Sequence, residues 1–315
     1  MWRCLATGVT RIVKSQFDRR RLLRWQRFYS ACIPRLSGRY DCAVSYSGGE
    51  TFWYVVEKVE ALRKVTYFHS DYSNIDIDAA KELAYLKKAD RIATISLACA
   101  DSLRRIFPTQ GDKVRVVQNP TCIGLVRKLS EEPVTDGFAA DNKRLKVVSV
   151  GRLEEPKGFD LAARGAAIAK REFGPVFEWV VVGDGGECEK VESIIAKEGI
   201  ADVFRLVGAK INPYPYMAAA DVMAQPSRFE GKSVVLDEAR VLGLPVLATA
   251  YSSVCDQVRD GIDGKVVAMS SEGIAEGIGV LVSDFGFLRK LTAGAQAEDV
   301  SELEDVSGFV ALLDD

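Results

Sequence analysis

From Lys146 onward the sequence alternates short β-branched runs with stretches whose apolar residues recur at helical spacing. Uninterrupted apolar runs such as Val180–Val182 and Val246–Ala248 indicate strands that are buried on both faces. Such strands, alternating with helices, form a parallel sheet covered by helices on both sides. The pattern predicts strands at Lys146–Val150, Val176–Val182, Val203–Val207, Asp221–Ala224, Pro245–Thr249 and Lys265–Val267, and helices at Asp160–Glu172, Glu187–Glu198, Tyr214–Ala220 and Ser233–Leu242.

Sheets of this kind bind ligands beyond the carboxyl ends of their strands, so the residues that follow strands are the candidates for a site. Gly151 and Arg152 follow the first strand, and Lys157 precedes the next helix. Glycine lets the backbone turn tightly and approach a ligand, and free N–H groups at a helix start favour anions. The two cations therefore suggest a diphosphate clamp, with a surface turn of solvated charges as the alternative.

Two further segments follow strands. Gly183–Cys188 resembles the dinucleotide pattern GxGxxG, but Cys188 occupies the third glycine position, so it indicates a glycine-rich turn that admits a ligand. In the second segment, Glu230 lies in a loop and Glu238 on the following helix, with Gly231 between them. Such a carboxylate pair can accept hydrogen bonds from the hydroxyls of a sugar and a ribose. The alternative is a surface helix with scattered acids.

Five blocks between Val148 and Val267, including VSVGRLEEPKGFDL, WVVVGDGGE and PSRFEGKSVVLDEA, resemble in order glycosyltransferase family four. This is the retaining GT-B family, also called glycosyl transferases group 1, and the wording is similar to its capsular and surface-polysaccharide branch. The resemblance implies an α/β fold with two Rossmann-like, doubly wound domains. It also implies a donor nucleotide sugar and no cofactor or catalytic metal, because two cations and a helix dipole can stabilise the leaving group.

The resemblance also implies roles for individual residues. Arg152 and Lys157 match the pair that neutralises the leaving diphosphate, and Glu238 matches the glutamate that holds the ribose hydroxyls. Glu230 matches the group that contacts the donor sugar. Leu206–Gly208 falls where the family places the base. The predicted catalytic residues are Glu230 and His69, and the predicted donor-binding residues are Gly151, Arg152, Lys157, Gly183, Gly208, Gly231, Lys232, Ser233 and Glu238.

The first part of the chain resembles the later part of the family's acceptor domain. His69 follows the apolar strand Val65–Phe68, where relatives carry a histidine that faces the donor sugar. About four strands precede Asn119-Pro120, and the family's opening strand and glycine-rich turn are missing, so we expect an incomplete domain with an unpaired sheet edge. The predicted organisation is a partial acceptor domain over 1–120, a polar linker over 121–144 and a donor-binding domain with C-terminal helices over 145–315.

The opening of the chain is strongly basic, although the net charge of the protein is −2. Its cations are interleaved with apolar residues, which is typical of a helix bound to an anionic membrane surface; a solvated helix that covers the sheet is the alternative. Membrane binding predicts cosedimentation with anionic liposomes that weakens with salt. The cations are Arg11, Lys14, Arg19, Arg20, Arg21, Arg24, Arg27, Arg35 and Arg39, and the one acid among them is Asp18.

Other features restrict the class of protein. The seven cysteines are scattered without a CxxC pair and there is one histidine, so we expect neither a disulfide framework nor a zinc site. No apolar run approaches the roughly 20 residues of a membrane span, and the opening lacks the apolar core of a signal peptide. We expect a cytosolic protein, peripheral on the inner face of the cell membrane, that does not bind nucleic acid.

The sequence therefore predicts a retaining glycosyltransferase. It would move a sugar from a UDP- or GDP-sugar to a glycan or lipid-linked glycan acceptor in surface polysaccharide synthesis, without a metal. The first alternative is a catalytically impaired protein of the same origin that binds nucleotide sugars. An NAD(P)-dependent oxidoreductase and a GT-B epimerase are further alternatives; the first of these two depends on the Gly183–Cys188 segment alone.

Overall fold

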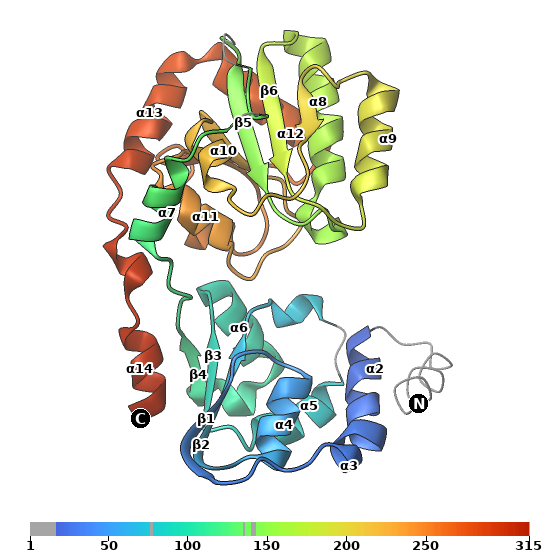
Figure 1. Ribbon diagram of the computed structural model, residues 1–315, viewed down its shortest axis with the longest axis vertical. Helices are drawn as coiled ribbons and strands as arrows, with labels where there is room; N and C mark the ends of the chain where they lie inside the picture. The colour runs from blue at the N-terminus through green and yellow to red at the C-terminus, as the bar shows by residue number, and fades with distance from the viewer. Residues whose placement is uncertain (1–16, 76–77, 135, 140–142, 315) are drawn as a thin grey trace. The chain divides into compact units, whose positions relative to one another are not determined.

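The computed structural model describes residues 17–75, 78–134, 136–139 and 143–314 (Figure 1). Their contacts divide them into two compact units. The first unit consists of the described residues up to Gln118 together with those from Val306 on, and the second unit is Asn119–Asp305. Each unit contains one parallel sheet.

The second unit contains six parallel strands in the order β10-β9-β8-β5-β6-β7. Every strand and helix expected between Lys146 and Val267 is present, with ends within two residues of those predicted. The strands are β5 (Leu145–Val150), β6 (Phe177–Val182), β7 (Phe204–Leu206), β8 (Val222–Gln225), β9 (Val246–Thr249) and β10 (Gly264–Val267). The helices are α7 (Ile123–Ser130), α8 (Phe159–Phe173), α9 (Cys188–Glu198), α10 (Tyr214–Ala218), α11 (Val234–Val241), α12 (Ser271–Ser283) and α13 (Phe285–Gln296).

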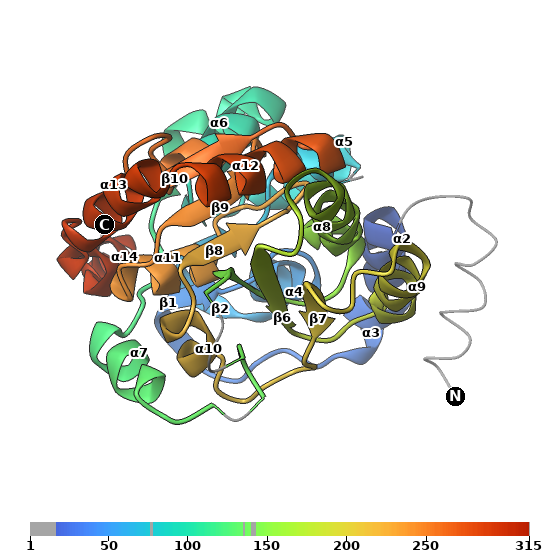
Figure 2. The same ribbon diagram turned by 90° about the horizontal axis from the view of Figure 1, so that it is seen from above.

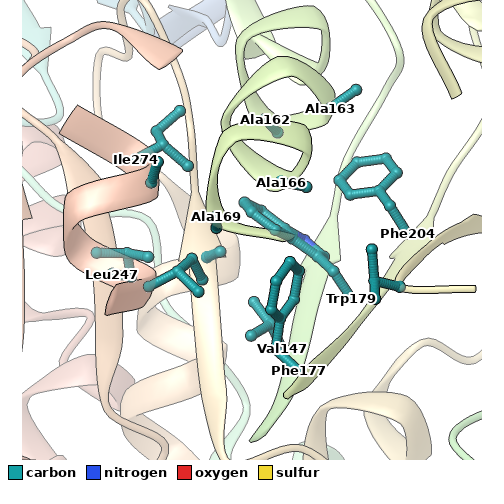
Figure 3. Close-up of a cluster of buried hydrophobic side chains, with 14 of the residues drawn as sticks. Val147, Ala162, Ala163, Ala166, Ala169, Phe177, Trp179, Phe204, Leu247 and Ile274 are labelled. Carbon is teal, nitrogen blue, oxygen red and sulfur yellow. The ribbon is translucent and has the colours of Figure 1, made fainter. Parts of the chain in front are cut away.

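Alternate residues of the central strands point to opposite faces of this sheet and form two cores. Val147 and Trp179 pack with α8, α9 and α12, whereas Val148 and Val180 pack with α10 and α11. Figure 3 shows the first of these cores, in which four alanines of α8 leave room for the ring of Trp179. Helices α8 and α12 lie side by side (Figure 2), and a Cβ on Gly165 of α8 would come within 2.7 Å of Ile274. The sheet is therefore doubly wound, as the sequence predicts.

The first unit contains four parallel strands in the consecutive order β1-β2-β3-β4. Because each crossover continues in the same direction, right-handed connections place the connecting helices on one face. The strands are β1 (Arg39–Ser45), β2 (Glu60–Phe68), β3 (Arg91–Thr94) and β4 (Val114–Val116). The helices are α2 (Phe17–Arg24), α3 (Ser30–Cys32), α4 (Glu50–Lys58), α5 (Ala79–Leu86), α6 (Leu97–Ile106) and, near the C-terminus, α14 (Ser307–Asp314), with the π-helical turn η1 (Trp25–Tyr29) between α2 and α3.

The domain boundaries differ from those expected at two places. Helix α14 belongs to the first unit, because Phe309 and Leu312 cover the sheet face that α4, α5 and α6 leave open. The range 121–144, expected as a linker, contains α7, whose Ile123 and Val126 pack with Val241 and Leu303 in the second unit. An amphipathic helix at either place buries apolar surface that a solvated linker or a separate C-terminal helix would expose.

The described part of the basic opening packs against α4, where the ring of Trp25 contacts Trp53 and Tyr54. Leu22 is 3% exposed and Trp25 is 1% exposed, and both pack in the core of the first unit. The Arg21 Nε donates to Glu50 on α4 at 2.7 Å. Both apolar side chains are therefore buried in protein and do not face the solvent. Arg11 and Lys14 lie outside the described residues, and membrane attachment through the remaining cations stays a prediction.

The structure also bears on the cysteines, on possible metal sites and on possible membrane spans. The six cysteines in the described ranges are free thiols; Cys4 lies outside these ranges. In the same ranges no group of His, Cys, Asp and Glu side chains is arranged to hold a metal ion. Each helix of the described chain is too short or too polar to cross a membrane.

Candidate functional site

The strand order of the second unit reverses between β5 and β8, and the loops that follow these neighbouring strands are joined. The backbone N–H of Arg228, after β8, donates to the carbonyl oxygen of Pro156, after β5, at 2.7 Å. Gly158 has a φ of +67°, and a Cβ there would lie 2.0 Å from the carbonyl oxygen of Pro226. The two loops therefore pack backbone against backbone at the topological switch point, where open α/β sheets bind ligands.

The predicted clamp residue Lys157 meets the predicted catalytic residue Glu230 in this place. The Lys157 Nζ lies 2.7 Å from Glu230 Oε1, with side chains that are 22% and 10% exposed. The same oxygen accepts from Gln225 Nε2 at 2.7 Å and from Ser227 Oγ at 2.6 Å. Three donors thus hold one carboxylate, and β8 supplies one of them from its last residue.

A second ion pair holds the start of α8 against the loop after β8. The guanidinium of Arg228 donates to both carboxylate oxygens of Asp160, at 2.8 and 3.0 Å, and also to the carbonyl oxygen of Glu155 at 2.7 Å. Burial favours a higher pKa for Asp160, but the hydrogen bonds and charge of Arg228, with help from Lys190, hold that pKa below its ordinary value. The ion pair holds the start of α8 in place, directly after the turn that contains Lys157.

The predicted glycines Gly151, Gly183 and Gly208 lie next to one another beyond β5, β6 and β7. Gly151 donates to the carbonyl of Val182 and Gly183 to that of Gly208, both at 3.0 Å. A Cβ on Gly183 would lie 1.8 Å from the carbonyl oxygen of Gly151. Gly183 therefore lets the backbone after β6 pack against the backbone after β5. Gly208, at φ +76°, faces open space among the described residues.

The predicted residues Gly231, Lys232 and Ser233 enter α11, where a buried polar cluster holds them. Gln257 accepts from the N–H of Ser233 at 2.7 Å and donates to its carbonyl at 2.8 Å. The Lys232 ammonium lies 2.7 Å from the buried Asp237 carboxylate, and its side chain is 6% exposed. The charge of Lys232 is thus paired with Asp237 in the folded chain, and its contact with a donor stays a prediction.

Ser233 and Tyr251 present buried hydroxyls next to Glu230 and Asp237. Within the described ranges, neither hydroxyl oxygen has a hydrogen-bond partner. Burial raises the pKa of Tyr251, and the charges of Glu230 and Asp237 raise it further. A buried hydroxyl without a hydrogen-bond partner destabilises the folded protein, and a hydrogen bond to a polar ligand or a water would remove this cost.

Glu238 lies on α11 and accepts a hydrogen bond from Tyr214 of α10 at 2.8 Å. Burial raises the pKa of Glu238; the hydrogen bond from Tyr214 opposes the shift, and the neighbouring Asp237 carboxylate adds to it. Burial and the Glu238 carboxylate together raise the pKa of Tyr214 to about 12. Glu238 thus holds its negative charge at a cost that additional hydrogen-bond donors, such as ribose hydroxyls, would reduce.

The raised pKa of Glu238 has a measurable consequence for stability. A carboxyl with a higher pKa in the folded than in the unfolded chain contributes stability below its ordinary pKa, and this contribution is lost as the pH rises through the raised value. We therefore expect Glu238→Gln to gain stability relative to the unaltered chain as the pH rises above 4.5, the ordinary pKa of a glutamate, as measured by urea unfolding. Glu276→Gln, an exposed glutamate on α12, is the control. A difference for Glu238→Gln that stays constant or falls with pH would contradict the assignment.

Arg152 and His69 are placed differently from the cluster around Glu230. Arg152 is exposed and, within the described part of the chain, its side chain makes no hydrogen bond or ion pair. His69 follows β2 in the first unit, where its ring stacks on Tyr67 with centroids 4.6 Å apart and lies 5.0 Å from the ring of Tyr46. The ligand-binding roles of both residues stay predictions.

The residues that hold the predicted ones in place were not predicted from the sequence. Gln225 and Ser227 are 3% and 0% exposed, and both donate to Glu230. A polar side chain at the end of an apolar strand was a usable signal for Gln225. For Arg228 and Gln257 no such signal exists, because their partners Asp160 and Ser233 lie far away in the sequence.

Comparisons with known proteins show the family and the fold of the chain. The family described as glycosyl transferases group 1 matches residues 132–297, more than half of the 315 residues. The amylovoran biosynthesis glycosyltransferase AmsK of Erwinia amylovora is 30% identical over 146 residues, which cover 44% of this chain and 35% of AmsK. The lipopolysaccharide core biosynthesis glycosyltransferase LpsE of Rhizobium meliloti is 26% identical over 208 residues, which cover 66% of this chain and 58% of LpsE.

The crystal structure of Alr3699/HepE from Anabaena in complex with UDP has a similar fold. The TM-score is 0.65 at 19% identity, over 80% of this chain and 70% of that one. The likeness confirms the predicted GT-B fold class, and the oxidoreductase alternative has no support left. The chain spans less than two thirds of the length of the two curated relatives. On the match over 132–297 and the strand-by-strand agreement of the second unit, the chain belongs to the glycosyl transferases group 1 family.

Proposed function

We propose that this protein is a retaining glycosyltransferase that moves a sugar from a UDP- or GDP-sugar to a glycan or lipid-linked glycan acceptor in surface polysaccharide synthesis. The observation that carries the proposal is the ion pair between Lys157 and Glu230 at the switch point of the six-stranded sheet. It places a cation and a carboxylate beside the start of α8, where a diphosphate and its attached sugar require opposite charges.

In the proposed reaction, the bond between the anomeric carbon and the diphosphate oxygen breaks, and the diphosphate keeps the electron pair. The acceptor hydroxyl oxygen forms the new bond to the anomeric carbon on the same face, and its proton passes to the departing diphosphate oxygen. Negative charge therefore gathers on the diphosphate, where Arg152, Lys157 and the N–H groups at the start of α8 stabilise it without a metal. Glu230 would accept hydrogen bonds from the donor sugar, and Glu238 from the ribose.

Arg152→Ala tests the diphosphate clamp without disturbing the fold, because this side chain is exposed. In a thermal-shift and calorimetric titration with UDP and GDP, we expect the unaltered chain to bind one of the two nucleotides. Arg152→Ala should weaken that binding at least about tenfold, since a charge-assisted hydrogen bond to phosphate is lost. Arg164→Ala removes an exposed arginine from α8 and is the matched control. Equal effects of the two substitutions would contradict the clamp.

A nucleotide-sugar binding protein without turnover is the second candidate. It is favoured by the consecutive strand order of the described part of the first unit, which lacks the reversal that creates a ligand crevice in a doubly wound sheet. Release of UDP or GDP from a nucleotide sugar separates the two candidates. Binding with no release, with or without glycan acceptors, would identify the second.

A further inference from the structure

The first unit contains a polar cavity of about 580 Å³ that the proposed reaction does not use. It lies at the amino end of β2, below the last turn of α4. Four cations and two acids line it, namely Arg35, Lys58, Lys64, Lys88, Glu57 and Glu60. Its volume is within the range of small-molecule sites.

Both acids of the cavity are engaged by other groups. Glu57 accepts from Ser30 Oγ and from Tyr85 Oη, each at 2.5 Å. Glu60 pairs with Arg39 at 2.8 Å. The four cations outnumber the two acids, so a ligand in the cavity would meet a net positive charge.

Three of the cations influence one another. The Lys64 Nζ donates to the carbonyl of Val56 at 2.9 Å, which holds it at the cavity wall. Burial lowers the pKa of Lys64, and the positive charges of Lys88 and Arg35 lower it further, whereas Asp90 opposes them. The Asp90 carboxylate already accepts from the backbone N–H of Lys64 at 2.7 Å. Like charges held together in this way repel one another, and a bound anion would remove that cost.

We infer that this cavity is a binding site for a phosphate-bearing anion, held by Arg35, Lys64 and Lys88. An ammonium group has three donors, so Lys64 keeps two beyond its bond to Val56. Arg35 adds a planar fork of N–H groups that matches phosphate oxygens, and Lys88 adds a third positive charge.

The cavity is remote from the carboxyl end of its own sheet. Lys64, the residue of β2 in the cavity lining that is nearest to the carboxyl end, lies five residues before His69, so roughly 16 Å separate the two at about 3.3 Å per residue. An anion at the amino end therefore takes no part in chemistry at the carboxyl end. A free phosphate compound would act there as a regulatory ligand of the first unit. A lipid headgroup would attach the protein to a membrane.

The test uses the full chain and inorganic pyrophosphate as the probe. All proteins carry Arg152→Ala, so that pyrophosphate binding at the proposed diphosphate clamp is weakened and is the same in every protein compared. One protein adds Arg35→Gln with Lys88→Gln. The control adds Lys87→Gln with Arg105→Gln, two exposed cations of the same unit outside the cavity lining. Both pairs change the net charge equally.

Calorimetric titration at low salt is expected to show pyrophosphate binding that the cavity pair weakens at least about tenfold, with the control pair within about twofold of its parent. No binding by the Arg152→Ala parent, or equal weakening by the two pairs, would overturn the inference. Loss of UDP binding by Arg152→Ala reports on the proposed transferase site alone, so the two proposals can fail separately.

Vesicles identify the source of the phosphate. If the cavity binds a lipid headgroup, phosphatidylcholine vesicles with added phosphatidic acid should sediment the control pair but not the cavity pair. If it binds a free phosphate compound, the two proteins should sediment equally while their pyrophosphate affinities differ. Either result supports the cavity as the site. Equal sedimentation together with equal pyrophosphate affinity of the two proteins would refute it.

Discussion

Gly158→Ala is expected to lower the free energy of unfolding by about 4 kcal/mol, as measured by urea denaturation of the full chain. Gly158 begins α8 at a φ of +67°, where a side chain costs about 1–2 kcal/mol. The rest of the effect comes from contact, because the added Cβ would lie 2.0 Å from the carbonyl oxygen of Pro226. That clash is with backbone, so it is relieved only if the loops after β5 and β8 separate.

Gly199→Ala is the matched control for this substitution. Gly199 ends α9 at a φ of +62°, nearly the same backbone conformation, and in the described chain no atom lies within 4 Å of an added Cβ. It should cost only the conformational part, about 1–2 kcal/mol. Equal losses for the two variants would mean that the packing of the two loops contributes nothing to stability.

The same pair of variants separates stability from function. Separation of the loops would move Lys157 away from Glu230, whereas Gly199 lies at the opposite end of its helix from the glycine-rich turn. Nucleotide binding should therefore decrease in Gly158→Ala under conditions in which both variants are folded.

The sequence was sufficient to predict the second unit because its strands carry a direct physical signal. Runs such as Val180–Val182 are apolar on both faces, which happens only where helices cover both sides of a sheet. Loops after such strands reach the same edge, so Lys157 and Glu230 were assigned to one site although 73 positions separate them. The prediction followed from topology.

Features that depend on particular tertiary contacts were not predictable in this way. The apolar side of α14 could cover any exposed sheet face. The sequence does not indicate that it covers the sheet of the first unit, whose connecting helices all lie on the opposite face. Gly183 was assigned to ligand approach, but the neighbour that excludes a side chain there is the backbone of Gly151. The contact of Lys232 with the donor stays a prediction, and its ion pair with Asp237 was not predicted from the sequence.

Glu230→Gln is expected to lower the free energy of unfolding by about 2 kcal/mol and to abolish nucleotide-sugar turnover. Oε1 of Glu230 accepts from Lys157, Gln225 and Ser227, and the side chain is 10% exposed. An amide oxygen can still accept from these donors, but without the charge the hydrogen bond to the ammonium weakens, and the other end of the amide brings a donor. Urea unfolding and release of UDP or GDP from the nucleotide sugar measure the two effects.

A double-mutant cycle with Lys157→Met shows whether the loss belongs to the ion pair. If it does, the double variant should be more stable than the sum of the single losses predicts, by about 1–2 kcal/mol, because each single change leaves one buried charge without its partner. The exposed pair of Arg171 and Glu198, at 3.4 Å with side chains 66% and 27% exposed, is the control. Glu198→Gln should cost less than about 0.5 kcal/mol, since water screens that pair. Additive losses for Lys157 and Glu230 would mean that the two charges act independently, and the proposed site would then lose the contact that joins its cation to its carboxylate.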